Sequence, residues 1–355
     1  MEIGPLFEES KDPGAVFTVS RFLGLICVNK TGELTTPLVV VSFLILSVSS
    51  AASVAAMLYS LLEHIDTNDQ TDNFWSATEI IRCSLDIVAV FTHFTSILVN
   101  RTKFRRSYVR VSRLRVYKSK SVELKIVVGM FAFRTCCSLF QIHIAEQRDQ
   151  IVDVISGHLT AFMYFNTTLI VLQMCTMTEA IRSKFDEFLK ISPQHYLLTD
   201  RHSKTVDFLV EVLSIYEGTL LIFALRSLIE MTSMGFYSYV TFYKVVNDHS
   251  MWYSAYSAVN LISLVVVLTT MFIVVRTCEM ASEQIECFHK ELFRQMRGNP
   301  SLCTNKKLSL YVSMRKTITF TACGFFTLGY PLITSIVAAA TTYLVILVQF
   351  SVPKT

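Results

Sequence analysis

The chain closes on the stretch TYLVILVQF, residues 342–350, in which a single amide, Gln349, lies near the end of an apolar run. In hydrocarbon an amide has no water to satisfy its donors and acceptor, so it has to face other protein or a water-filled path through protein. The stretch therefore predicts a membrane-spanning helix whose polar residue lines a pore. An interhelical hydrogen bond that holds a helix bundle together accounts for Gln349 equally well.

Long apolar runs return along the whole chain, of which 52% is hydrophobic. Since a helix needs about 20 mainly apolar residues to cross a bilayer, seven stretches qualify as spans: residues 36–63, 74–99, 122–143, 151–178, 216–243, 252–276 and 328–350. The sequence therefore predicts an all-α, multi-pass membrane protein with seven transmembrane helices.

Lysine and arginine are distributed unevenly between the connections. They gather in residues 100–121, 179–215 and 277–327, whereas the connection between the first two spans carries Asp66, Asp69 and Asp72 and no lysine or arginine. Because positively charged loops stay in the cytoplasm during insertion, we expect the amino terminus inside and the carboxyl terminus outside. This inverted topology is the opposite of that of G-protein-coupled receptors.

The expected organisation follows from these spans. Helical patterning continues beyond the fourth span and beyond the sixth span, until Gly298-Asn299-Pro300 ends the latter, and a further helix is expected over 306–319. The predicted parts are a cytoplasmic segment 1–35, a bundle of six helices over 36–276 with cytoplasmic loops 100–121 and 179–215, cytoplasmic anchor helices over 277–327, a last helix over 328–350 and an extracellular tail 351–355.

Polar side chains inside the spans form stripes at helical spacing. The ligand-binding candidates are Glu79, Arg82 and Asp86 of the second span, Arg134 and Gln141 of the third, Asp153 and His158 of the fourth, Glu230 and Tyr237 of the fifth, and Tyr253, Tyr256 and Asn260 of the sixth. Ionisable groups at such depth are functional candidates by default. For any single residue an internal ion network or aromatic packing is the favoured alternative, and His93 is expected to be a core histidine with its hydrogen bonds satisfied.

Several function classes find no support in the sequence. There is no glycine-rich phosphate loop, no H-E-x-x-H or G-x-S-x-G motif, and no paired C-x-x-C, so we expect neither an enzyme nor a cofactor or metal site. The basic run over 101–120 directly follows a span, which favours contact with anionic membrane lipid over nucleic acid.

The segment ACGFF, residues 322–326, followed by TYLVILVQF resembles the carboxyl-terminal signature of the insect gustatory receptor family, in which T-Y, five hydrophobic residues and Q-F follow one another. The signature residues are Thr342, Tyr343, Gln349 and Phe350. The stretch FLGL at 22–25, the inverted seven-span pattern and the long helical extensions are also similar to that family. Gly329-Tyr330-Pro331 departs from the polar or charged pair that is common there before the last span.

This resemblance implies a ligand-gated, non-selective cation channel that detects a small tastant or metabolite. Its partners would be the ligand, the permeating cations and membrane lipid, in a homotetramer or a heterotetramer with related receptors at the plasma membrane of a sensory neuron. The last helix would line the pore through Thr342, Ile346, Gln349 and Phe350, which share one helix face. The ligand would bind among spans two to six. A non-conducting receptor subunit that needs a partner and a secondary transporter stay open as alternatives.

Overall fold

The computed structural model describes residues 15–29, 33–64, 70–113, 122–144, 148–190, 196–248, 251–313 and 319–351. Its elements are α1 (Ala15–Phe22), α2 (Thr36–His64), α3 (Gln70–Val99), α4 (Arg101–Arg113), α5 (Val122–Ile144), α6 (Arg148–Lys190), α7 (Tyr196–Asp248), α8 (Met251–Gly298), α9 (Pro300–Cys303), α10 (Lys306–Ser313), β1 (Thr321–Ala322), β2 (Phe326–Thr327) and α11 (Tyr330–Ser351).

The predicted all-α membrane fold is confirmed. In the described parts of the chain, six helices are long and apolar enough to cross a membrane by length and composition, and they lie in α2, α3, α6, α7, α8 and α11. The seventh expected span coincides with α5, which packs against α6 and α8. Each of the seven expected spans therefore falls on a helix of one bundle.

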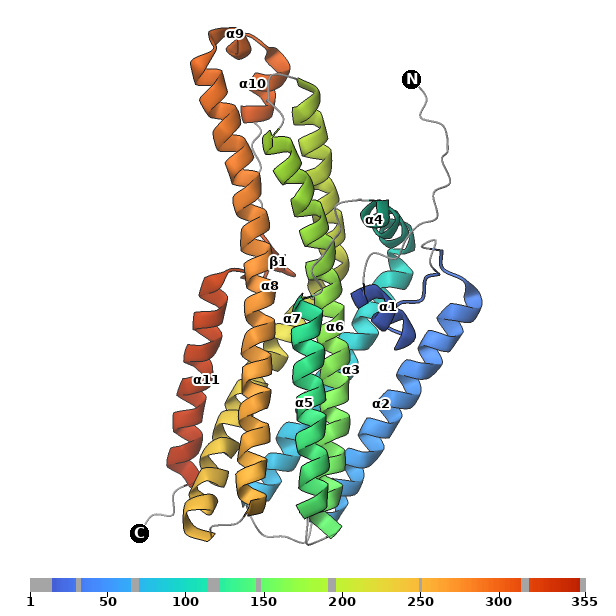
Figure 1. The fold of residues 1–355 in the computed structure, drawn as a ribbon, viewed down its shortest axis with the longest axis vertical. Coiled ribbons are helices and arrows are strands. Elements are labelled where there is room, and N and C mark those ends of the chain that lie inside the picture. The colour runs from blue at the N-terminus through green and yellow to red at the C-terminus, as the bar shows by residue number, and fades with distance from the viewer. Residues whose placement is uncertain are drawn as a thin grey trace.

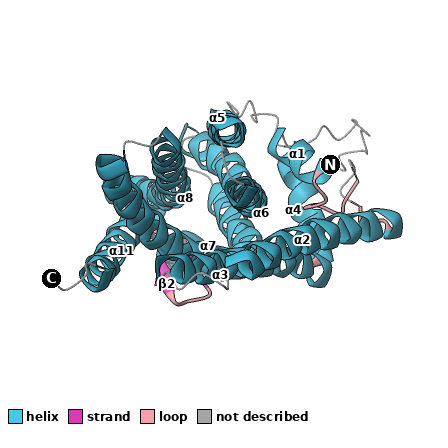
Figure 2. Ribbon diagram, turned by 90° about the horizontal axis from the view of Figure 1, so that it is seen from below, coloured by secondary structure: helices cyan, strands magenta, loops and turns pink. Residues whose placement is uncertain are grey.

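The helices run roughly along one long axis (Figure 1). α6, α7 and α8 are much longer than the others and continue to the end that carries α9 and α10. Seen along the axis, α11 and α2 lie at opposite edges of the bundle (Figure 2). α7 is central to the packing, because it contacts α3, α6, α8 and α11.

The helical extensions expected beyond the fourth and sixth spans are continuous with α6 and α8, and α8 ends at Gly298 as the sequence predicts. A ring cluster joins the extension of α7 to α8 and α10. The His202 ring stacks on Phe288 with a centroid distance of 3.9 Å, and its Nδ1 lies 2.6 Å from the Tyr311 hydroxyl. Burial raises the pKa of Tyr311, so this hydroxyl keeps its proton.

The segment between α8 and α11 differs from the single helix expected over 306–319. Helix α10 ends at Ser313, Thr319 is not helical, and β1 pairs with β2 in an antiparallel hairpin. Cys323 and Gly324 both have a positive φ in its turn, which suits the primed turns of tight hairpins. The hairpin redirects the chain into α11, where Pro331 occupies the first turn and Glu279 of α8 accepts a hydrogen bond from the Tyr330 amide at 3.3 Å.

The expected segment 1–35 contains a structured element that the sequence reading did not anticipate. Helix α1 buries Val16, Phe17 and Ser20, and the Phe17 ring meets Tyr108 of α4 edge-on at 5.7 Å. After α1 the chain turns at Gly24, whose φ of 72° lies in the left-handed region. A Cβ there would lie 3.2 Å from the Ile45 Cβ and 3.3 Å from the Ser42 backbone of α2. The turn and the close approach to α2 both require glycine.

We predict that Gly24→Ala lowers stability by about 1–3 kcal/mol, because it combines a left-handed backbone with a close contact. The measurement is the thermal unfolding of the purified protein in detergent. Gly157→Ala is the matched control, since a Cβ at Gly157, in the first third of α6, would meet no atom of another element within 4 Å. An unchanged melting temperature for Gly24→Ala would contradict the role of this turn.

Candidate functional site

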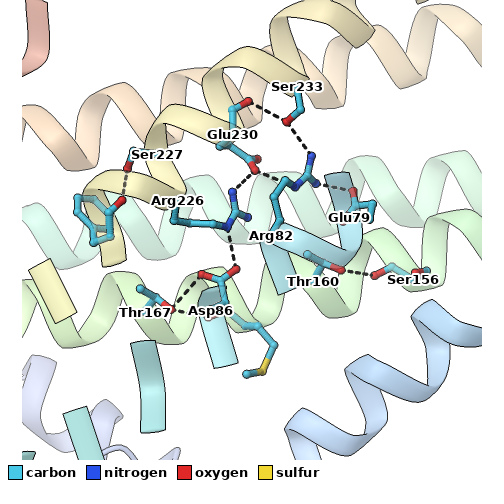
Figure 3. Close-up of polar contacts among 12 residues, drawn as sticks. Glu79, Arg82, Asp86, Ser156, Thr160, Thr167, Arg226, Ser227, Glu230 and Ser233 are labelled. Carbon is cyan, nitrogen blue, oxygen red and sulfur yellow. Dashed lines mark hydrogen bonds and ion pairs between the residues drawn. The ribbon is translucent and has the colours of Figure 1, made fainter. Parts of the chain in front are cut away.

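Five charged side chains meet in the interior between α3 and α7, and we call them the ion cluster: Glu79, Arg82 and Asp86 of α3 with Arg226 and Glu230 of α7. All five are at most 5% exposed. The three residues of α3 are spaced by three and four positions, so they lie on one helix face, as the sequence predicted. Arg226 and Glu230 are one turn apart on α7 and face them (Figure 3).

The Glu230 carboxylate is the centre of the ion cluster. Its Oε2 atom lies 3.0 Å from Nε of Arg82 and also pairs with Nη1 of Arg226. Arg82 pairs in addition with Glu79 on its own helix, while Nε of Arg226 lies 3.1 Å from Oδ2 of Asp86. The two arginines therefore link α3 to α7 at two levels.

Three uncharged residues complete the surroundings of the ion cluster. The Thr167 hydroxyl of α6 donates to Oδ1 of Asp86 at 3.1 Å, and Arg82 donates to the Ser233 hydroxyl of α7 at 3.2 Å. The guanidinium of Arg226 lies 5.1 Å from the centre of the Tyr164 ring of α6. Thr167 and Tyr164 were not among the predicted residues, because a hydroxyl in an apolar run gives no signal of its partner.

The ion cluster is built as a structural clasp more than as an open binding site. Buried charges are tolerated only when they are paired, and removing one partner leaves an uncompensated charge in a dry interior. Here three carboxylates share two guanidiniums, and Oε2 of Glu79 has no hydrogen-bond partner among the described residues. The arginines are therefore the indispensable members, and Glu79 is the member with the least compensation.

Other predicted residues lie elsewhere in the bundle. Tyr237 of α7 and Asn260 of α8 are buried, Tyr256 of α8 is half-buried, and half-buried His158 of α6 lies 5.8 Å from the Phe131 ring of α5 between ring centres. His93 is buried and stacks on Tyr216, as expected of a core histidine, but neither ring nitrogen has a hydrogen-bond partner among the described residues. The side chains of Arg134, Gln141, Asp153 and Tyr253 lie outside the described residues, and so does that of Phe350.

Asn260 is distinguished by its amide. It is 4% exposed, and its Nδ2 has no hydrogen-bond partner among the described residues. An unpaired donor in an apolar interior is costly, about 1–3 kcal/mol. A ligand that accepts a hydrogen bond at this position would remove that cost.

Helix α11 presents two different faces. Ile336 and Ala340 are buried against the bundle, whereas Thr342, Ile346 and Gln349 are exposed on the other side. The Thr342 hydroxyl donates to the Ala338 carbonyl of its own helix at 2.9 Å.

The contact between α7 and α11 is close at one point. A Cβ at Gly235 would lie 3.2 Å from Cδ2 of Leu344, so the leucine side chain packs directly on the glycine. Gly235 is five residues beyond Glu230 on the same helix. α7 therefore contacts α11 close to the ion cluster.

Comparisons with known proteins agree with this architecture. The family model described as 7tm chemosensory receptor matches residues 14–352. No curated protein sequence matches the chain. Among solved structures, the insect olfactory receptor OR5 from Machilis hrabei is similar, with a TM-score of 0.60 at 12% identity, over 95% of this chain and 97% of that chain. At this identity the likeness shows a shared fold.

We predict different effects on stability for two substitutions that remove a charge from the ion cluster. Arg226→Met leaves Asp86 and Glu230 undercompensated and should destabilise the protein by about 3–5 kcal/mol. Glu79→Gln removes the least compensated charge and should leave stability unchanged or raise it. Thermal unfolding in lipid nanodiscs measures both, with Arg294→Met as the control because that side chain is 77% exposed. A Glu79→Gln variant as unstable as Arg226→Met would contradict the assignment.

Proposed function

Because this chain belongs to the 7tm chemosensory receptor family, we propose that it is a subunit of a ligand-gated, non-selective cation channel. A small tastant or metabolite opens the channel, which is a tetramer of this chain or of this chain with related receptors. It acts at the plasma membrane of a sensory neuron, with the amino terminus and the helical extensions in the cytoplasm. The positive charge of the connections after the even-numbered spans supports this orientation.

The exposed amide of Gln349 is the observation that carries the proposal. In α11, 11% of the span is buried within the chain, against 44–67% in α3, α6, α7 and α8. α2 is also poorly buried, yet it exposes apolar side chains such as Val40, Leu44 and Val48, which suit lipid. Gln349 makes no hydrogen bond to a described residue, and in the hydrocarbon core of a membrane its amide would stay without hydrogen-bond partners. Four copies of α11 around a central axis would bring the Gln349 amides into contact with water inside a pore.

The residues of this face suit weak ion selectivity. A ring of neutral amide oxygens replaces part of an ion's hydration shell without the strong field that a carboxylate ring provides. Ile346 and Phe350, near the same level of the helix, would form a hydrophobic constriction that closes by dewetting. We therefore propose that sodium, potassium and caesium ions pass with similar permeability.

The ligand site that we propose lies between α6, α7 and α8, on the side of the ion cluster that is nearer the carboxyl end of α7. Tyr237, Tyr256 and Asn260 supply aromatic surface and one unpaired amide donor. These features favour a neutral ligand with an apolar body and a hydrogen-bond acceptor. Sugars, bitter compounds and other metabolites all carry a hydrogen-bond acceptor, and they differ in how much apolar surface they offer.

Gating requires that the ligand bind the open state more tightly than the closed state, since equal affinity shifts nothing. Closure of α8 on α7 around a ligand would move α7, and the seat of Leu344 against Gly235 would pass that movement to α11. In this mechanism the ion cluster keeps α7 fixed to α3, while the part of α7 nearer its carboxyl end moves.

The test of conduction compares two cysteine substitutions in cells that express the receptor alone and with a related receptor. Gln349→Cys should make ligand-evoked current sensitive to an extracellular thiol reagent, because the side chain faces the pore. Leu347→Cys is the matched control on the half-buried side of α11. A reagent that blocks neither variant, or that blocks both alike, contradicts a pore lined by this face. Equal reversal potentials in sodium, potassium and caesium would support the predicted selectivity.

The ligand site is tested at Asn260. Asn260→Leu should weaken activation by about 2–10-fold, which is the contribution of one hydrogen bond. Ser263→Ala is the matched control one turn further along α8, because the Ser263 hydroxyl donates to the Val259 carbonyl of its own helix. Identical dose–response curves for Asn260→Leu and the unmodified receptor would exclude this contact.

A further inference from the structure

Helix α4 carries an unusual concentration of positive charge. Its sequence, RTKFRRSYVRVSR, contains six basic residues and no acidic residue over Arg101–Arg113. The helix begins two residues after the end of α3, which is one of the candidate membrane spans. In Figure 1 it lies beside α1, just beyond the level at which α2 begins.

One face of α4 is fixed to the protein. Phe104, Ser107, Tyr108 and Val111 recur at helical spacing and are at most 1% exposed. The Tyr108 hydroxyl accepts a hydrogen bond from Arg21 of α1 at 2.7 Å. The orientation of the helix is therefore set by its apolar face, and the basic residues cannot turn inward.

The remaining faces present more positive charge than the protein neutralises. Arg105 pairs with Glu33 at 2.7 Å and Arg106 with Glu211 at 3.1 Å. Arg101 and Lys103 are exposed and form no ion pair with a described residue. The Arg110 guanidinium lies over the Phe208 ring, 5.0 Å from its centre.

The surroundings of α4 are apolar where the membrane is expected. Val99, the last residue of α3, is 75% exposed, and Phe22, the last residue of α1, is 85% exposed. Large exposed apolar side chains beside a basic helix suit the boundary between acyl chains and headgroups. Water alone would leave both side chains unfavourably hydrated.

We propose that the exposed basic face of α4 binds the headgroups of anionic phospholipids in the adjacent leaflet. Clusters of four to eight basic residues directly after a membrane helix attract such lipids by charge complementarity. The proposal goes beyond channel function and does not depend on it. It makes the lipid composition of the membrane a determinant of receptor stability through the contact of α4 with α1 and α7.

The experiment measures binding of short-chain phospholipids to the full-length protein in neutral detergent. Phosphatidylinositol bisphosphate should bind more tightly than phosphatidylserine, and phosphatidylcholine should not bind. The Arg101→Gln/Lys103→Gln variant, which removes the two exposed charges without an ion pair, should bind the bisphosphate lipid about 25-fold more weakly, at about fivefold per charge. The matched control, Lys290→Gln/Arg294→Gln/Arg297→Gln, removes three exposed charges from the last turns of α8 and should bind normally.

Three results would overturn the proposal. They are equal losses in the two variants, no binding by the unmodified protein, and binding of free inositol trisphosphate as tight as that of the lipid. Salt provides a test that needs no variant, should the α4 variant fail to fold. Binding to the unmodified protein should weaken steeply as salt rises, because exposed charges are screened. Affinity that does not change with salt would also reject the basic face as the site.

Discussion

Two buried guanidinium groups hold α3 and α7 together: Arg82 of α3 pairs with Glu230 of α7, and Arg226 of α7 pairs with Asp86 of α3. In a membrane there is no hydrophobic driving force between helices, so packing and polar contacts decide which faces meet. A shift of α7 along or around its axis would separate buried charges from their partners. The ion cluster therefore sets the register of α7, and α7 in turn contacts α3, α6, α8 and α11.

The fixed position of α7 explains why α11 can be so poorly covered. Among the described residues, α11 packs mainly on α7 and α8, with the hydrogen bond between Tyr330 and Glu279 at its first turn. Further along α11, the Leu344 side chain packs on Gly235 of α7. These two contacts hold α11 at one edge of the bundle (Figure 2), and the face that carries Gln349 stays exposed.

Much of the fold follows from residue patterns that act locally. Runs of apolar residues predicted the spans, and Gly298-Asn299-Pro300 predicted the end of α8, because both depend on a few neighbouring residues. The common face of Glu79, Arg82 and Asp86 was likewise predictable from spacing. Their partners were not, since nothing in the sequence says which face of α7 meets α3. The hairpin after α10 was missed because its turn depends on a positive φ at Cys323, a residue that seldom adopts one.

The ion cluster also limits where a ligand can act. Its arginines are already paired, so a ligand that took one of them would have to compensate a buried carboxylate at a cost of several kcal/mol. The Asn260 amide donor is not engaged in this way, because its Nδ2 is buried without a hydrogen-bond partner among the described residues. A ligand at Asn260 gains a hydrogen bond without breaking an ion pair. In the proposed mechanism, ligand recognition at α8 and the rigid link to α3 are therefore separate, and α7 lies between them. α7 is paired to α3 at Glu230 and contacts α11 at Gly235, five residues further on.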